Sequence, residues 1–241
     1  MSYHVLPSIS PEETVVWFDL EGVLMEDNIS LYLLSHKPFL MIKSFLNGVV
    51  KATCNNFWNR KKDFTEEWTE DCKKHYEGRM TPLERSSLGR LIFNSQSEQH
   101  KDVLLDLFKV LKEDGYDLYV ITSANREIAY GFLNSFPEEL RLPQEKIFAS
   151  DERYVDRNVK AAIVRDIKRK SNKIIVGAGD TRTEEDALEE SDVPYIVRSK
   201  SSFLMPCKIQ RGLKVDNLYA IKSMFDMVHY ERFFREKDLN L

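Results

Sequence analysis

Two carboxylates and a glycine interrupt the first apolar run of this chain. The run Val15–Met25 reads VVWFDLEGVLM and contains Asp19, Glu21 and Gly22. A short apolar run bounded by turn residues is typical of a buried strand, and open α/β sheets bind ligands at the carboxyl ends of their strands. Gly22 allows a sharp turn because glycine tolerates positive φ. Asp19 is therefore either an ordinary strand-ending residue or part of a ligand site.

A second strand end also carries an acidic residue. The run Lys173–Ala178 reads KIIVGA and leads through Gly179 to Asp180. If both strands lie in one parallel sheet, Asp19 and Asp180 follow strands at the same edge. Carboxylate oxygens at such an edge suit a hard cation such as Mg²⁺.

Hydroxyl, amide and ammonium groups follow other predicted strands. The run Asp117–Thr122 ends in Thr122, and Ser123 and Asn125 come directly after it. These groups could hold a phosphate, and Lys160 could add a positive charge at the start of a later helix. Each feature alone has an ordinary explanation, such as a helix cap or a solvated lysine. Their shared position at strand–helix junctions favours one common site.

The remaining pattern predicts the elements that would position these groups. Apolar residues at helical spacing alternate with short apolar runs, which indicates an α/β fold with a parallel sheet and crossover helices. Helices are predicted over Gln99–Asp114, Glu127–Phe136, Val159–Lys170, Thr183–Glu190 and Tyr219–Tyr230. Further strands are predicted at Lys146–Ala149, Pro194–Arg198 and within Leu213–Leu218.

A long segment between the first two strands is predicted to be mostly helical. It covers roughly Glu26–Asn94 and contains no convincing core strand. Asp63–Glu66 resembles a capping box, and Lys73 and Lys74 suit the last turn of the same helix. Thr81–Glu84 combines an N-cap, a proline and a glutamate, which predicts another helix start. The segment is long enough to form a lobe of its own.

Composition describes an ordinary globular protein. The chain has 241 residues and a formal charge of −4, which gives no general reason to expect nucleic-acid binding. The cysteines Cys54, Cys72 and Cys207 lack metal-ligand spacing and fit free thiols in a reducing compartment, with a single disulfide left open. No signal-peptide pattern or membrane-length apolar run is present. A cytoplasmic location is the default expectation.

Taken in order, these motifs resemble those of the haloacid dehalogenase-like (HAD) superfamily. This chain has DxEG, a strand ending in Thr, a Lys, and GD followed by acids. The family has DxDG, a strand ending in Ser or Thr, a Lys or Arg, and GDxxxD. The resemblance covers about Thr14 to Val197, and the helical insertion is similar to the cap of the phosphoserine phosphatase-like branch. It implies a Rossmann-like core (1–24 and 95–230), a helical cap (25–94) and a charged tail (231–241).

The resemblance implies a role for each matching residue. Asp19 matches the nucleophile that forms an aspartyl-phosphate, which divides one difficult displacement into two easier ones. Thr122 matches the hydroxyl that binds the transferring phosphoryl group, and Lys160 matches the cation that offsets its charge. Contacts to phosphate or substrate are expected at the same sheet edge, from Gly22, Thr122, Ser123, Asn125 and Lys160.

The resemblance also implies a Mg²⁺ site. Asp180 matches a metal ligand, together with Asp19 and the backbone carbonyl of Glu21. The following acidic position of the motif is filled by either Glu184 or Glu185. Metal and lysine would neutralise charge as the phosphoryl group moves.

Two residues depart from the family pattern. The general acid and base two positions after the nucleophile is usually Asp, and here it is Glu21. Its side chain is longer by one methylene, and a misplacement of about 1 Å can lower a rate about 100-fold. Asn28 occupies the position at which phosphoserine phosphatases have a Glu for the substrate's amino group, so phosphoserine is not implied.

The cap segment is rich in basic residues. Residues 29–62 contain no Asp or Glu but six Lys and Arg residues among several aromatic ones. The favoured interpretation is amphipathic helices whose basic face meets water. Alternatives are a field that attracts an anionic substrate and a surface that touches an anionic membrane.

The leading hypothesis is a Mg²⁺-dependent phosphomonoester hydrolase acting on a small phosphorylated metabolite. A catalytically weak phosphate-binding or regulatory protein and a phosphotransferase are the alternatives. A dinucleotide site is disfavoured because Gly177-Ala178-Gly179 lacks the third glycine of that motif and comes late in the chain. Neither the substrate nor the oligomeric state follows from the sequence.

Overall fold

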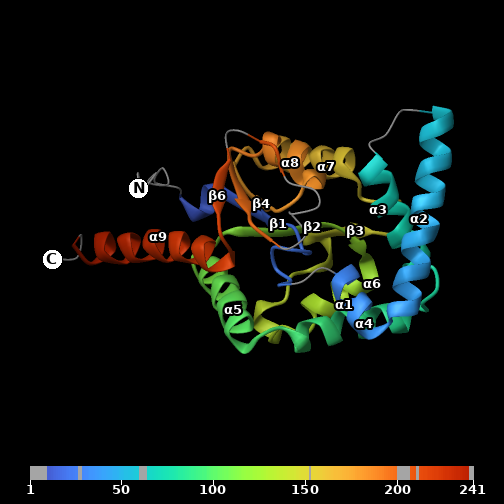
Figure 1. Cartoon of the computed structure of the whole chain (residues 1–241). Coiled ribbons are helices and arrows are strands. Elements are labelled where there is room, and N and C mark those ends of the chain that lie inside the picture. The colour runs from blue at the N-terminus through green and yellow to red at the C-terminus, as the bar shows by residue number, and fades with distance from the viewer. Residues whose placement is uncertain are drawn as a thin grey trace.

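A computed structural model gives the fold of the chain (Figure 1). It describes residues 10–26, 29–59, 64–151, 153–199, 207–209 and 212–238. Within these ranges the three cysteines are free: Cys54 is exposed, Cys72 is buried and Cys207 is half-buried. None of the helices in the described ranges has an apolar stretch long enough to cross a bilayer.

One parallel sheet forms the centre of the molecule. Among the described residues it has six strands in the order β3-β2-β1-β4-β5-β6, and every neighbouring pair is parallel. The strands are β1 (Thr14–Phe18), β2 (Asp117–Asn125), β3 (Ile147–Ser150), β4 (Ile174–Gly179), β5 (Val193–Val197) and β6 (Leu213–Val215). The predicted α/β fold class and parallel sheet are confirmed.

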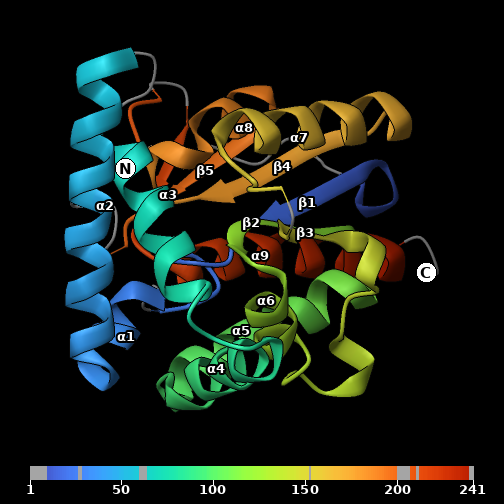
Figure 2. The same ribbon diagram turned by 90° about the vertical axis from the view of Figure 1, so that its right-hand side faces the viewer.

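Helices cover both faces of this sheet (Figure 2). The α-helices of the chain are α1 (Ile29–His36), α2 (Pro38–Asn59), α3 (Phe64–Glu77), α4 (Pro82–Ser95), α5 (Glu98–Glu113), α6 (Arg126–Leu133), α7 (Arg157–Ser171), α8 (Glu185–Glu190) and α9 (Leu218–Asp238). Short 3₁₀ helices lie at Pro11–Glu13, Glu138–Leu140, Gln144–Lys146 and Arg182–Glu184. Helices α7 and α8 pack on one face, and α5, α6 and α9 pack on the other.

Strand β1 is buried on both faces because it lies in the middle of the sheet. Val16 and Phe18 join the apolar cluster that includes α5, α6 and α9, whereas Val15 and Trp17 join the cluster under α7 and α8. All five β1 residues are buried. This explains why the strand reads as a continuous apolar run rather than as an alternation of apolar and polar residues.

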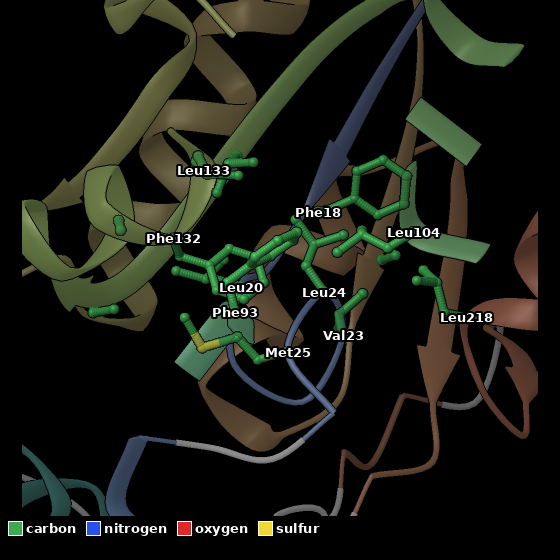
Figure 3. Packing of buried hydrophobic residues seen from close by; sticks show 14 of the residues in the cluster. Phe18, Leu20, Val23, Leu24, Met25, Phe93, Leu104, Phe132, Leu133 and Leu218 are labelled. Carbon is green, nitrogen blue, oxygen red and sulfur yellow. The ribbon is translucent and has the colours of Figure 1, made fainter. Parts of the chain in front are cut away.

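The segment after β1 is anchored in the same core. Figure 3 shows Phe18, Leu20, Val23, Leu24 and Met25 among side chains from other elements: Phe93, Leu104, Phe132, Leu133 and Leu218. Leu20, Leu24 and Met25 have no exposed surface. The apolar residues on either side of Asp19 and Glu21 therefore fix the backbone that carries both carboxylates.

The helical segment lies beside the carboxyl ends of the strands. In Figure 2 the arrowheads of β1 and β4 point toward α3 and α2. Helix α2 packs on α3, where Gly48 lies against Trp68, and its outer side leaves Phe39 and Leu46 exposed. Helix α4 packs instead on the core helix α6, where a Cβ on Gly89 would overlap the carbonyl of Ile128. The boundaries predicted for the cap, the core and the tail remain a proposal.

Local signals predict most helix ends. Thr81 caps α4 in a full capping box, since its hydroxyl accepts from the Glu84 amide and the Glu84 carboxylate accepts from the Thr81 amide. The box predicted at Asp63–Glu66 includes Asp63, which lies outside the described residues. The sequence predicts that the final helix ends at Tyr230, but α9 continues to Asp238 through part of the expected tail.

Candidate active site

Two neighbouring strands bring Asp19 and Asp180 together. Phe18 of β1 pairs with Ala178 of β4, and the Asp19 amide donates to the Ala178 carbonyl at 2.9 Å. Gly22 follows with a φ of 81°, and a Cβ at this position would overlap Oδ2 of Asp180. The turn therefore needs glycine both for its backbone angle and for the close approach of Asp180.

Lys160 reaches this edge from α7. Its Nζ donates to Asp19 Oδ1 at 2.7 Å and also bonds Glu184 Oε1. Lys160 is fully buried, so its charge is balanced by these two carboxylates rather than by water. The predicted strand–helix junction thus does deliver an ammonium group to Asp19.

A group of three buried carboxylates could hold a metal ion. Asp19, Asp180 and Glu184 each offer one oxygen, and these atoms lie within 4.8 Å of one another. Glu184 is fixed by the amide and hydroxyl of Thr181, at 3.0 and 2.6 Å. Glu185, the alternative from the sequence, pairs with Arg157 at 3.1 Å. An all-oxygen donor set of this kind fits a hard divalent cation such as Mg²⁺.

Burial and Lys160 determine the charge states of this group. Burial raises the pKa of Asp19 to about 7, against the opposing attraction of Lys160. Burial also opposes ionisation of Glu184, but Lys160 outweighs it and holds the pKa of Glu184 below its ordinary value. For Lys160, the two carboxylates outweigh burial and keep its pKa well above the ordinary lysine value.

The polar residues at the end of β2 have different surroundings. Thr122 is fully buried, and its Oγ1 accepts from the Ala124 amide at 3.1 Å. The Asn125 side chain caps α6 by accepting from the Glu127 amide at 3.0 Å. Ser123 turns toward the cap, where its hydroxyl accepts from Lys73 at 3.0 Å. Thr122 therefore stays a candidate for phosphate binding, whereas Asn125 has a structural partner.

Glu21 is held by α1 and α3, two helices of the segment predicted to form a cap. Its Oε1 accepts from the Ile29 amide at 3.1 Å, and its Oε2 pairs with Lys73 of α3. The side chains of Glu21 and Lys73 are each only 9% exposed. The Glu21 side chain therefore lies outside the Asp19–Asp180–Glu184 group, as expected if only its carbonyl were to serve a metal.

The sequence does not indicate Lys73 as a site residue, because Lys73 and Lys74 both suit the last turn of an exposed helix. Only Lys74 behaves in that way, with its side chain 52% exposed. Burial alone would lower the pKa of Lys73, but Glu21 outweighs it and holds that pKa well above the ordinary value. The signal that could have indicated Lys73 was its spacing in the helix, because it lies one turn before Tyr76 and Glu77, which are both buried.

Glu77 adds a further buried carboxyl group beside Lys73. Its Oε1 has no hydrogen-bond partner among the described residues, and burial raises its pKa from 4.5 to about 7. Lys73 and Arg85 oppose this rise, and Glu21 contributes to it. The cap side of the site thus contains one lysine and two carboxyl groups that the sequence motifs did not indicate as a cluster.

Comparisons by sequence leave this chain without a match: no protein-family model and no curated protein matches it. Solved structures with a similar fold do match it. A phosphoserine phosphatase from T. onnurineus aligns with a TM-score of 0.53 and 16% identity, covering 90% of this chain and 96% of its own.

Two other solved structures align similarly. A phosphoserine phosphohydrolase-like protein from Francisella tularensis has a TM-score of 0.51 and 15% identity, with 88% and 99% of the two chains covered. A HAD family hydrolase from Salmonella enterica has a TM-score of 0.56 and 14% identity, with 86% and 68% covered. Together with the parallel sheet and its helical insertion, these alignments show that the chain has the fold of the HAD superfamily, in its phosphoserine phosphatase-like form.

Proposed function

We propose that this chain is a phosphomonoester hydrolase that acts on a small phosphorylated substrate through an aspartyl-phosphate on Asp19, with Mg²⁺ as cofactor. The main support is the contact between Asp19 and Lys160 beside two further carboxylates at the carboxyl edge of the sheet. The order of the motifs and the fold of the aligned phosphatases agree with this interpretation.

Asp19 is the nucleophile of the first step. Its carboxylate oxygen forms a bond to phosphorus, and the bond from phosphorus to the substrate's leaving oxygen breaks. Glu21, which must carry a proton in the substrate complex, gives that proton to the leaving oxygen. Lys160 lies 2.7 Å from Asp19 Oδ1, so its charge offsets the charge that gathers on the nucleophile and the phosphoryl group. The Thr122 hydroxyl donates to a phosphoryl oxygen.

Water completes the reaction in the second step. A water molecule attacks phosphorus, its proton passes to Glu21, and the bond between phosphorus and Asp19 breaks. Inorganic phosphate is released, and both carboxyl groups return to their starting states. The same Glu21 therefore acts as acid and then as base.

Asp19, Asp180 and Glu184 would hold the Mg²⁺ ion, with the carbonyl of Glu21 as a further proposed ligand. When bound, the ion supplies positive charge that stabilises the transferring phosphoryl group. Lys160 already bonds two of these carboxylates, so it limits the repulsion among them.

Release of phosphate from p-nitrophenyl phosphate, with and without Mg²⁺, tests this function. Asp19→Asn keeps the shape of the side chain but removes the nucleophile, so turnover should fall at least about 1000-fold. Asp151→Asn, at a carboxylate paired with Arg126 on the surface, is the matched control and should leave the rate unchanged. Equal turnover by Asp19→Asn and the wild type would refute the mechanism.

A screen of small phosphorylated metabolites then separates the remaining candidates. Metal-dependent hydrolysis of one of them supports the proposal. Phosphate binding without turnover would instead favour a binding or regulatory protein, and transfer to an acceptor other than water would favour a phosphotransferase.

A further inference from the structure

The carboxylate of Glu21 is tied to the cap by two contacts. Oε1 accepts from the Ile29 amide at the start of α1, and Oε2 pairs with Lys73 in α3. Lys73 also donates to the Ser123 hydroxyl at 3.0 Å, next to Thr122 at the end of β2. One ammonium group therefore joins the cap to both the nucleophile loop and the neighbouring strand.

These contacts are internal rather than superficial. The Lys73 and Glu21 side chains are both 9% exposed, and their backbones are far apart in the sequence. A buried ion pair is sensitive to geometry, because removing one partner leaves the other charge unpaired. The pair can form only when α3 lies against the end of β2 and the loop after β1.

The length of the Glu21 side chain matters for this arrangement. An aspartate at the same position is shorter by one methylene, so it would be withdrawn from Lys73 and Ile29 together. The backbone cannot move to compensate, because Leu20, Val23 and Leu24 beside it are buried in the core. Glu21, which replaces the usual Asp of the family pattern, is thus the residue long enough to reach the buried Lys73.

We propose that Lys73 is a positioning residue for the hydrolase: from cap helix α3 it holds the Glu21 carboxylate in the place where it acts on the leaving group and on water. This inference rests on the proposed function. It gives the cap a role in positioning Glu21, because Glu21 is correctly placed only while α3 lies against the end of β2 and the loop after β1.

Kinetics on p-nitrophenyl phosphate with Mg²⁺ test the proposal. Lys73→Met should lower kcat about 30-fold and leave KM within about threefold, since misplacing an acting group slows turnover rather than binding. Lys73→Arg, which keeps a charged donor, should recover most of that loss. Lys74→Met is the matched control, because Lys74 is the neighbouring lysine and pairs with Glu70 on the surface.

Glu21→Asp gives the decisive comparison. It should lower kcat about as much as Lys73→Met, and the double variant should be no slower than the slower single variant, because both changes break one arrangement. Losses that multiply in the double variant would overturn the proposal. A gain in kcat by Glu21→Asp, or a rise in KM alone for Lys73→Met, would also overturn it.

Hydrogen exchange distinguishes failure of this proposal from failure of the proposed function, because it needs no turnover. The amides of α3 and of Ile29 should exchange about tenfold faster in Lys73→Met and at the wild-type rate in Lys74→Met. If the wild type hydrolyses nothing but exchange follows this pattern, the docking role holds and the hydrolase does not. Unchanged exchange in Lys73→Met refutes the docking role. Lys73→Gln, which keeps a donor, replaces Lys73→Met if the latter does not fold.

Discussion

Two buried lysines, each from a different helix, bond carboxylates at the end of β1 and in the loop after it. Lys160 comes from α7 in the core and bonds Asp19 and Glu184, whereas Lys73 comes from α3 in the cap and bonds Glu21 and Ser123. Lys160 thus hydrogen-bonds two carboxylates, whereas Lys73 hydrogen-bonds one carboxylate and one hydroxyl and has Glu77 as a further carboxyl group nearby. In the proposed function, the core cluster (Lys160, Asp19, Asp180 and Glu184) supplies charge for the reaction, and the cap cluster (Lys73, Glu21, Glu77 and Ser123) fixes the position of Glu21.

The two clusters also differ in how they depend on the rest of the molecule. Lys160 and its partners are carried by elements that pack against the sheet directly, so their geometry is set with the core. Lys73 is carried by α3, which contacts Glu21 of the loop after β1 through this lysine and joins the apolar core through Cys72 and Tyr76. A change in cap position should therefore disturb Glu21 long before it disturbs Asp19.

Removal of Lys160 should have the largest effect. Lys160→Met leaves Asp19 and Glu184 buried without their shared cation, so we expect at least about a 1000-fold loss in kcat/KM and a loss of about 4 kcal/mol in the free energy of unfolding. Lys168→Met, at an exposed lysine of the same helix that pairs with Asp192, is the control. Chemical denaturation and kinetics measure both quantities. If Lys160→Met lowers kcat/KM no more than Lys73→Met does, the two clusters do not differ in their importance for turnover.

A pH-dependent stability should come from the cap cluster. The pKa of Glu77 is raised from 4.5 to about 7, so the folded chain keeps a proton that the unfolded chain loses. The stabilisation is fully present below about pH 4.5 and is lost as the pH rises through about 7, which amounts to about 3 kcal/mol. Denaturant unfolding of the wild type and Glu77→Gln across this window isolates the contribution of Glu77.

Between about pH 4.5 and about pH 7, the difference in free energy of unfolding between the wild type and Glu77→Gln should change by about 3 kcal/mol. A parallel pH dependence in both proteins would show that Glu77 does not control the change.

Gly22, which lies between the two clusters, should have an intermediate effect. Gly22→Ala forces a side chain into a left-handed backbone and against Asp180, so we expect a loss of about 2 kcal/mol in stability and weaker Mg²⁺ binding. Gly115→Ala is a matched control, because Gly115 has a φ of 86° and a Cβ added there would have nothing within 4 Å. Mg²⁺ titration of both variants should show a weaker affinity only for Gly22→Ala; weakening in both would point to backbone strain alone.

Loss of the Ser123 hydroxyl should have the smallest effect. Ser123→Ala removes one acceptor from Lys73 but leaves the pair with Glu21, so we expect about 1 kcal/mol in stability and a change of a few fold in kcat. Ser135→Ala, which removes a hydroxyl bonded only within its own helix region, is the control. A loss in kcat equal to that of Lys73→Met would show that Ser123, rather than Glu21, is the main partner of Lys73.

Three members of the core cluster could be predicted from the sequence because each lies at a recognisable strand–helix junction. Asp19, Asp180 and Lys160 lie next to strands or helix starts whose apolar patterns are clear, and parallel pairing brings such junctions to one edge. The choice between Glu184 and Glu185 could not be made, since both are acidic and adjacent in the chain. Only the path of the backbone decides that Glu184 turns inward and Glu185 meets Arg157.

The cap cluster could not be predicted in the same way. Lys73 lies beside Lys74 in a helix rich in charged residues, and which of the two is buried depends on how α3 docks on β2 and on the loop after β1. Helical periodicity places Lys73 on the side of Tyr76 and Glu77, but it does not say what that side meets. To identify side chains that pair across separately predicted elements, the tertiary structure must be known.

The position of β1 in the sheet has a consequence for how the chain folds. This strand comes first in the sequence, yet its neighbours β2 and β4 pair with it from about 100 and about 160 residues further along. Contacts between such distant segments slow folding, because a long loop must close before they form. During synthesis, β1 therefore stays unpaired until β2 follows about 100 residues later, and its other side stays open until β4 follows about 160 residues later.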